Sequence, residues 1–269
     1  SDIGVKNADG TPGVWTGITK NDAYFDGSYR NLPYMYQTAE GEPLASFYLI
    51  KTDGIFQSDA EAAAYVNKDG KRIQPDAVAG DLKFVDANGD GVINDEDRQY
   101  CGSATPKTTF SFSGGFTWKK LSVSAMFQGV GGAQALYVGK YMALSDVEGN
   151  FNRSKEIMNA WSPSNTGSNI PRLSKNDPNS NFSTPSDWYL ENASYLRLKS
   201  LSFNYRLPKK IIQRWGFSNI DVYVTGYNLF TWTKYTGQDP EVKTENTYAR
   251  DSATTPASIQ LVAGFNLSF

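Results

Sequence analysis

The sequence predicts an all-β protein, and three observations favour an antiparallel transmembrane β-barrel. Residues 259–269 place an apolar or small side chain at every odd position, over about the length of a strand that crosses a bilayer at a tilt. The chain contains 16 Tyr and 24 Gly but only 20% charged residues, which is typical of many strands joined by turns. No segment approaches the roughly 18 consecutive apolar residues of a membrane helix. A helical membrane protein is therefore not expected.

The first part of the chain predicts short elements. Residues 1–42 are rich in Gly, Asp and aromatic side chains without periodicity, so we expect loops with short strands there. Residues 43–56 predict a strand that ends in a turn at Asp53-Gly54. Residues 58–65 combine a Ser cap, early acidic residues and an alanine run, which predicts a short helix.

The clearest strand signals come later in the chain. Residues 108–118 alternate aromatic with small polar side chains, Lys119-Lys120 makes a tight turn, and residues 121–127 resume the apolar alternation, which predicts an antiparallel hairpin. Further strands are predicted at residues 194–207, 220–230 and 259–269.

Residues 133–190 form a long insertion between these strands. A helix is predicted at Arg153–Trp161, where Pro163 stops it. The remainder is polar, and a loop of this length is usually functional or disordered.

The alternation leaves two all-β architectures open. Strands with one apolar face build soluble sandwiches as well as membrane barrels, because the pattern does not reveal whether that face meets a second sheet or lipid. Strand length and the aromatic residues at strand ends favour the barrel.

The composition excludes several classes of function. A formal net charge of −2 offers no basic excess to neutralise phosphates, so nucleic acid is not an expected partner. The chain has no histidine, which removes Ser-His-Asp and Cys-His catalysis and a histidine-based zinc site. The single Cys101 has no partner for an intrachain disulfide, and we expect a small half-buried side chain.

Residues 86–97 (DANGDGVINDED) fit the cation loop of an EF-hand. The candidate ligands are the side chains of Asp86, Asn88, Asp90 and Asp97 and the backbone carbonyl of Val92. Gly91 permits the sharp bend that lets alternate residues wrap one cation. The flanks do not predict helices, so this is a cation loop without the two helices of the hand. Calcium is the expected ion, and magnesium stays open because Asp97 is shorter than the usual Glu.

The alternative interpretation of this loop is an Asx-rich turn that needs no metal. In either case we expect a structural role, in which the loop fixes the surrounding chain.

Other candidate residues have weaker support. Exposed aromatic side chains could stack on sugar rings, but an interfacial girdle or ordinary core is the favoured interpretation. The aromatic candidates are Tyr24, Phe25, Tyr29, Tyr34 and Tyr36, with Trp161 and Trp188 within or near the long insertion. Asp187 with Glu191, or Asp239 with Glu241, could be nominated as a carboxylate pair for glycoside hydrolysis. Because 28 acidic residues make chance pairs common, no enzyme is predicted.

Several stretches, taken in order along the chain, resemble one family. They are SFYLIKTDGIF (46–56), GDLKFVDANGDGVINDEDR (80–98), TPKTTFSFSGGFTWKKLSVSAMFQG (105–129), ENASYLRLKSLSFNYRLP (191–208), VYVTGYNLFTWTKYTGQDPEV (222–242) and GFNLSF (264–269). Together they resemble the C-terminal part of SusC/RagA-type TonB-dependent transporters of the Bacteroidetes outer membrane. The resemblance implies that residues 1–269 supply about eight to ten strands of a 22-stranded barrel with long extracellular loops.

The resemblance also implies function and partners. It implies import of a bulky nutrient, oligosaccharide more than peptide, across the outer membrane in a multi-pass barrel. The implied partners are a SusD-like surface lipoprotein, TonB, outer-membrane lipid, and an N-terminal portion of the same transporter that carries the plug and the remaining strands. Phe269 fits the aromatic ending that barrel-assembly machinery recognises.

Two rivals from other classes are a soluble calcium-stabilised carbohydrate-binding β-sandwich and a secreted β-rich glycosidase. Neither accounts for the terminal Phe269 together with the run of family-like stretches.

Overall fold

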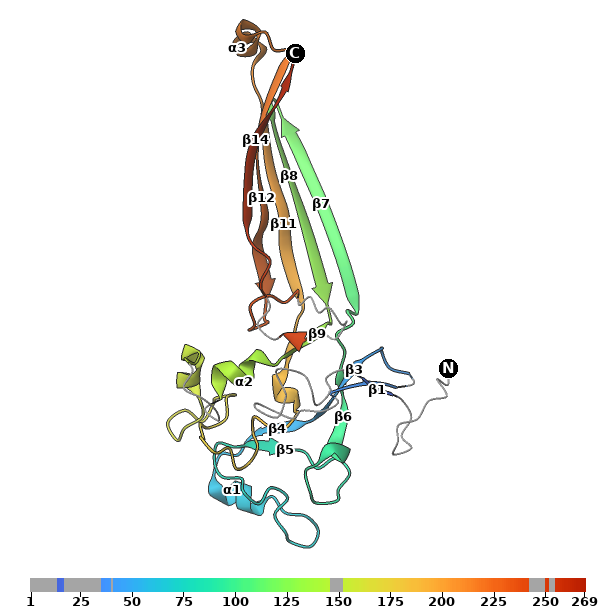
Figure 1. The fold of residues 1–269 in the computed structure, drawn as a ribbon, viewed down its shortest axis with the longest axis vertical. Coiled ribbons are helices and arrows are strands. Elements are labelled where there is room, and N and C mark those ends of the chain that lie inside the picture. Colours follow the sequence, from blue (N-terminus) through green and yellow to red (C-terminus); the bar gives the residue numbers. More distant parts are fainter. Residues whose placement is uncertain (1–13, 17–34, 40, 146–151, 242–249, 252–254) are drawn as a thin grey trace. The chain divides into compact units, whose positions relative to one another are not determined.

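A computed structural model describes residues 14–16, 35–39, 41–145, 152–241, 250–251 and 255–269 (Figure 1). The chain divides into two compact units. The first comprises Ser1–Thr105, Gln134–Glu191 and Val242–Ala253, and the second comprises Pro106–Ala133, Asn192–Glu241 and Thr254–Phe269. Among the described residues, no helix is long and apolar enough to cross a membrane.

The second unit is built on one sheet of five long strands. In chain order these are β7 (Thr108–Trp118), β8 (Leu121–Gly131), β11 (Tyr195–Arg206), β12 (Asn219–Thr233) and β14 (Gln260–Ser268). Their order in the sheet is β14-β12-β11-β8-β7, and every neighbouring pair is antiparallel (Figure 1). The five predicted strands are thus confirmed as a meander, in which strands that follow one another in the sheet also follow one another in the chain.

Local backbone features set the register of this sheet. Trp118 pairs with Leu121 across a two-residue turn, and Lys119 in that turn has a φ of 57°, as tight hairpin turns require. The register of β11 shifts between Leu198 and Ser200 against both neighbours, so Lys199 lies at a β-bulge.

The two ends of the sheet differ in the length of their connections. At one end, here called the turn end, lie the Lys119-Lys120 turn and residues 207–218, which contain helix α3 (Lys209–Ile212) and the 3-10 helix η4 (Gln213–Trp215). At the other end, here called the loop end, residues 132–194 and 234–259 leave the sheet and return to it. Short connections at one end and long ones at the other are typical of outer-membrane barrels.

The described part of the first unit contains three small sheets. The largest has the order β1-β2-β3-β6, formed by β1 (Val14–Thr16), β2 (Tyr36–Thr38), β3 (Ser46–Ile50) and β6 (Arg98–Gly102). Strands β4 (Thr52–Ile55) and β5 (Leu82–Phe84) pair with each other. The third sheet has the order β10-β9-β13 and consists of β9 (Gln134–Tyr137), β10 (Leu190–Asn192) and β13 (Arg250–Asp251).

Short helices complete the first unit. They are α1 (Asp59–Ala64), α2 (Gly139–Leu144) and the 3-10 helices η1 (Asp95–Asp97), η2 (Lys155–Asn159) and η3 (Asp187–Tyr189). The predicted cap of α1 is confirmed, because the Ser58 side chain accepts a hydrogen bond from the Glu61 amide. The helix predicted at Arg153–Trp161 is instead the short 3-10 helix η2.

One strand prediction needs correction. The single strand predicted at residues 43–56 is two strands, β3 and β4, in different sheets. The described residues contain five strands of membrane-crossing length, and the total of eight to ten barrel strands stays a prediction. In the first unit, buried and less buried side chains alternate only over strands of three to five residues. These short strands pack around a compact core and do not form one long flat face.

The core of the first unit is aromatic and fully closed. One cluster joins Tyr36, Phe47, Phe182 and Tyr189, each at most 2% exposed. Beside it, a second cluster includes Leu82, Phe84 and Trp161. The unit therefore has the interior of a water-soluble domain.

Buried polar groups attach the long insertion to this core. Asp81 is fully buried and receives hydrogen bonds from Arg172 Nε at 2.7 Å and Asn181 Nδ2 at 2.8 Å. The Asn181 side chain in turn accepts the Leu82 amide at 2.8 Å, and Gln74 accepts the Phe84 amide at 2.8 Å. Side-chain amides thus satisfy backbone groups on the side of β5 where no described strand pairs with it.

Candidate functional site

The register of the five long strands sorts their side chains onto two faces. One of them, the apolar face, carries apolar or aromatic side chains and glycine, with Thr108 at the loop end of β7 as the exception. It contains Phe110, Phe112, Phe116 and Trp118 of β7; Leu121, Val123, Ala125 and Phe127 of β8; Leu196, Leu198, Leu201, Phe203 and Tyr205 of β11; Val222, Val224, Phe230 and Trp232 of β12; and Leu261, Ala263, Phe265 and Leu267 of β14.

The opposite face, here called the polar face, carries mostly hydroxyl, amide and charged side chains. Its members include Thr109, Ser111, Ser113, Thr117, Ser122, Ser124, Gln128, Arg197, Ser200, Ser202, Asn204, Arg206, Asp221, Thr225, Thr231, Gln260 and Asn266. Hydroxyl groups bond across the strands, as between Ser202 and Thr225 at 2.8 Å. Met126, Val130 and Val262 are the apolar exceptions.

Most side chains of the apolar face are exposed or half-exposed, and Leu198 is buried among its neighbours. Phe116, Trp118 and Phe265 are 62%, 63% and 67% exposed. Water-soluble proteins rarely leave so large a contiguous apolar surface uncovered. A sandwich would bury this face under a second sheet, and among the described residues no second sheet of the same unit covers it. An apolar face opposite a polar one is the arrangement of a transmembrane barrel wall.

Aromatic side chains gather at both ends of the apolar face. Toward the loop end, Phe112 and Phe127 stack with their ring centroids 4.7 Å apart, and Trp232 lies 6.4 Å from Phe127. At the turn end, Lys119 Nζ lies 4.7 Å from the centroid of the Trp118 ring. Two aromatic bands at the ends of an apolar surface match the interfacial girdles of membrane barrels.

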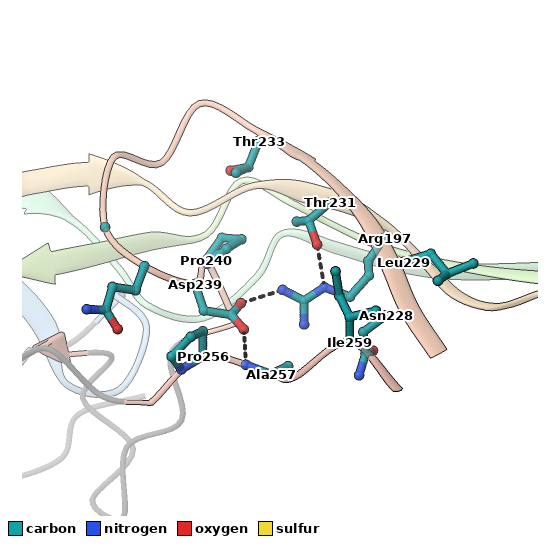
Figure 2. Close-up of a pocket in the computed structure, with 12 residues that line it drawn as sticks. Arg197, Asn228, Leu229, Thr231, Thr233, Asp239, Pro240, Pro256, Ala257 and Ile259 are labelled. Carbon is teal, nitrogen blue, oxygen red and sulfur yellow. Dashed lines mark hydrogen bonds and ion pairs between the residues drawn. The ribbon is translucent and has the colours of Figure 1, made fainter. Parts of the chain in front are cut away.

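A pocket of about 270 Å³ opens on the polar face near the loop end of the second unit (Figure 2). Arg197 is its buried cation, with a side chain only 3% exposed. Its guanidinium donates to Thr231 Oγ1 at 2.8 Å, to Glu241 Oε2 at 2.8 Å and to Asp239. Lys199 Nζ, from the bulge, also reaches Glu241 at 2.8 Å.

Asp239 is held by backbone groups as well as by Arg197. Its carboxylate accepts the Glu241 amide at 2.9 Å and the Ala257 amide at 2.8 Å. Burial opposes ionisation of Asp239, but the Ala257 amide, the Arg197 guanidinium and the Glu241 amide together hold its pKa below the usual value. The charges of this pocket are thus satisfied within the protein, and they attach the segment after β12 to the polar face.

The sequence did not predict this network. Asp239 and Glu241 were nominated only as one of many chance carboxylate pairs, and the cation that joins them was not identified. An available signal was the position of Arg197 within an alternating strand, since a buried cation on a polar face requires partners. The two carboxylates of the other nominated pair have separate partners: Asp187 accepts the Thr52 amide and hydroxyl at 3.0 and 2.7 Å, while Glu191 pairs with Lys140 at 2.7 Å.

In the predicted cation loop, carboxylate side chains accept hydrogen bonds from backbone amides of the same loop. Asp86 accepts the amides of Gly89 and Gly91, at 2.8 and 2.9 Å. Asp90 accepts the Val92 amide at 2.8 Å, and this bond, with one from Asn88, lowers the pKa of the exposed Asp90 carboxyl. Gly91 has a φ of 86°, which supports the predicted sharp bend.

Asp97 closes the predicted loop from inside. It is fully buried and accepts the amides of Ala87 and Asn94, both at 2.8 Å. Within the described ranges, no group of three or more His, Cys, Asp or Glu side chains converges as metal ligands. Carboxylate oxygens that accept one hydrogen bond retain further lone pairs for a cation, so the calcium site stays a prediction that rests on Asp86, Asn88, Asp90, Val92 and Asp97.

The remaining candidates have structural positions. Tyr24, Phe25, Tyr29 and Tyr34 lie outside the described residues. Tyr36 is a buried core residue 5.4 Å from the Phe47 ring centroid. Trp161 is buried, and Trp188 donates to the Asn169 carbonyl at 2.8 Å. Cys101 is half-buried, as expected.

Phe269 is 90% exposed, and its ring centroid lies 5.0 Å from that of Phe217. Its role as an assembly signal stays a prediction.

Comparison with known proteins gives a consistent result. No family model matches the chain. Three proteins of Formosa agariphila match it: TonB-dependent receptor P3 (33% identical over 77% of this chain), P26 (31% over 75%) and P39 (25% over 87%). The chain spans about a fifth to a quarter of the length of these relatives, covering 19%, 19% and 26% of them.

Solved structures agree with the sequence matches. A chain of the RagAB peptide transporter superposes with a TM-score of 0.69 at 26% identity, over 97% of this chain and 25% of that one. The RagAB peptide importer in its open-open state gives 0.65 at 28% identity, over 87% of this chain and 23% of that one. The fold, with its sheet of one apolar and one polar face, identifies the class of protein: the chain is a segment of an outer-membrane receptor. The chain belongs to the TonB-dependent receptors, and its structure is similar to a chain of the RagAB peptide transporter.

Proposed function

We propose that the receptor containing this chain imports a bulky nutrient across the outer membrane with energy supplied through TonB. The observation that carries the proposal is the sheet of five long strands, with one face almost entirely apolar and the other mostly polar. The free energy of such a sheet is lowest when lipid covers the apolar face and the polar face lines an aqueous lumen. The similarity to TonB-dependent receptors supports the mode of energy supply.

In this proposal the five strands form part of a larger barrel wall. Strands β7 and β14 are the sheet edges, and each leaves one row of backbone groups without a strand partner among the described residues. Unpaired edges in hydrocarbon are very unfavourable, because no water is present to satisfy them. The remaining strands of a 22-stranded barrel, and the plug, would come from the rest of the receptor. A denaturing gel of the purified complex tests this, since it must contain the polypeptide that carries the plug.

In this proposal the long connections of the sheet, residues 132–194 and 234–259, run on the extracellular side. They leave the sheet at the loop end, which is the extracellular end when short turns face the periplasm. The closed core of the first unit suits that unit to water. A SusD-like lipoprotein is the proposed partner for this surface, and the RagAB neighbours, with open-open and closed-closed states, support a complex that opens and closes.

The lumen side of the sheet is the proposed wall of the ligand path. The network of Arg197, Asp239 and Glu241 fixes the segment after β12 at the loop end, so it shapes the entrance of that path. Because its charges are satisfied internally, we assign it positioning rather than catalysis. No bond of the nutrient is broken in this proposal.

Oligosaccharide and peptide are both candidate cargo. The sequence-based expectation favours oligosaccharide, whereas the solved neighbours are described as peptide transporters, which supports peptide. The hydroxyl-rich polar face can bond to either class.

Uptake in the native bacterium tests the proposed function. Deletion of the receptor gene is expected to abolish growth on one polymer, supplied as the sole carbon or nitrogen source, and the intact gene restores it. Growth on the monomeric sugar or amino acid serves as the control, because small solutes cross through porins. Loss of TonB must give the same phenotype. Unchanged growth of the deletion strain on glycans and on peptides would contradict the proposal.

We also propose that residues 86–97 bind calcium as a structural ion on the first unit. Support comes from the spacing of Asp86, Asn88 and Asp90 and the positive φ of Gly91.

A further inference from the structure

The turn end of the sheet is strongly basic. Residues 115–125, 201–224 and 262–269 contain a single acidic residue, Asp221, although the whole chain has a net charge of −2. The basic residues there are Lys119, Lys120, Arg206, Lys209, Lys210 and Arg214. Arg206 is paired, with Nε 2.9 Å from Asp221 Oδ1. The other five are exposed, and none forms an ion pair within the part of the chain that the structure describes.

The connection between β11 and β12 adds exposed apolar side chains beside these charges. Within Lys209–Trp215, Ile212 is buried, but Ile211 and Trp215 are 45% and 61% exposed. The segment is fixed to the sheet, because the Leu207 amide donates to the Ile220 carbonyl at 2.9 Å and the Ser218 amide to Ser268 at 2.8 Å. Figure 1 shows α3 beside the C-terminus at this end of the sheet.

The basic rim is continuous with the apolar face. Trp118 ends β7 on that face, and Lys119 lies over its ring. Lysine and arginine side chains next to exposed tryptophan are typical of the boundary between hydrocarbon and head groups, where the stems lie along the apolar surface and the charges reach water.

At the loop end of the same sheet, ion pairs within the protein involve more of the cations. Arg197 and Lys199 are both paired with carboxylates of the protein. These two loop-end cations are therefore neutralised within the protein, although Lys107 and Lys234 are exposed at that end without an ion pair among the described residues. At the turn end five of the six cations are exposed in this way. An external anionic surface is the complement that the turn end lacks.

We propose that the turn end binds the phosphate head groups of anionic phospholipids in the membrane leaflet that the short connections face. The proposal rests on the proposed function for the orientation of the sheet. Lys209, Lys210 and Arg214 contact the head groups, while Ile211 and Trp215 enter the boundary region.

Lipid binding by the purified full receptor tests this proposal. Delipidated receptor in neutral detergent is titrated with phosphatidylglycerol or phosphatidylethanolamine, and bound lipid is counted by native mass spectrometry. The wild type is expected to prefer phosphatidylglycerol. The variant K209Q/K210Q/R214Q is expected to bind it about 10- to 100-fold more weakly, with binding of phosphatidylethanolamine unchanged.

The matched control is K68Q/K71Q/K155Q, which removes three exposed lysines from the first unit and must bind lipid as the wild type does. If the triple variant does not assemble, K119Q/K120Q removes two charges of the same rim and is expected to weaken the preference in the same direction. Equal binding of both lipids by the wild type, or an equal loss in the control, would overturn the proposal. Because lipid counting does not involve nutrient uptake, a failure here is distinct from a failure of the transport proposal.

Discussion

The two units of this chain place their aromatic side chains in opposite ways. In the first unit Tyr36, Phe47 and Phe182 are fully buried. In the second, Phe116, Trp118 and Phe265 are more than 60% exposed. The same aromatic residue types are buried in one unit and exposed in the other, so the hydrophobicity of the side chains alone does not distinguish the two units. The spacing of the apolar residues does, because long two-residue alternation gives a flat face and short irregular runs give a closed core.

The difference indicates two surroundings. A closed aromatic core is what a domain needs to fold in water, where the hydrophobic effect drives burial. An exposed apolar face is stable only where the surroundings are themselves apolar. We therefore regard the first unit as folded for water and the second for lipid, and the following predictions test or refine that distinction.

The largest expected effect comes from the buried ion pairs, one in each unit. D81A leaves Arg172 without its carboxylate, and R197A leaves Asp239 without its cation while Glu241 keeps only Lys199. Each is expected to destabilise its own unit by about 3–5 kcal/mol. In hydrogen exchange of the full receptor, D81A should accelerate exchange in β5 but not in β12, and R197A the reverse.

Each of these variants is the control for the other. Acceleration spread equally over both units by either one would contradict the division into separate folding surroundings.

A charge introduced on the apolar face gives the next largest effect. A125R places a guanidinium on that face in the middle of β8, whereas S124R places it on the polar face one residue away. Arginine on the lipid side of a barrel at the bilayer centre costs about 2–4 kcal/mol, and on the lumen side much less. The folding equilibrium of the receptor in phospholipid vesicles, followed in urea, measures both. Equal costs for the two variants would be evidence against a lipid-facing side.

Much of the second unit could be predicted from the sequence, and much of the first could not. The hairpin of β7 and β8 followed from alternation and the Lys119-Lys120 turn alone. The split of residues 43–56 did not, because each half has too few residues for a period to emerge. The side-chain network of Asp81 and Arg172 joins residues 91 positions apart, which no local pattern reveals.

The candidate site shows the same limit. The apolar and polar faces were predictable because the two-residue alternation that defines them is visible within the sequence of each strand. The Arg197 pocket was not, because its partners come from a different segment, 42 and 44 residues away.

Calcium should stabilise the first unit through residues 86–97. D86N/D90N removes two carboxylates from the predicted loop, and D69N/D76N removes two exposed ones elsewhere in the unit as the control. With calcium at about 100 times its dissociation constant, the wild type and the control should gain about 2.7 kcal/mol over metal-free buffer, and the loop variant much less. Calorimetric unfolding with calcium and with chelator measures the difference. Identical gains in all three proteins would remove the predicted site.

The smallest effect concerns the thiol in the first unit. Burial, reinforced by the carboxylate of Asp187, raises the pKa of Cys101 to about 11. The stability associated with this shift is fully present below the ordinary thiol pKa of about 8.5 and is lost as the pH rises toward 11. Alkylation of Cys101 by iodoacetamide at pH 8 should therefore be about 100-fold slower than in the urea-unfolded chain. Equal rates at pH 8 would show that the first unit does not bury this thiol.

The central claim is that the apolar face of the sheet meets lipid and the polar face meets water. Measuring which of the two surrounds each successive residue of β8 tests it most directly. Spin labels are attached to single cysteines at positions 122–127, in a full receptor that lacks other reactive cysteines, including Cys101, and is reconstituted in lipid. Collisions with oxygen should be frequent at 123, 125 and 127, and collisions with a water-soluble nickel chelate at 122, 124 and 126. A profile without a two-residue period, or one in which the odd positions meet the nickel chelate, would contradict the assignment of the apolar face to lipid.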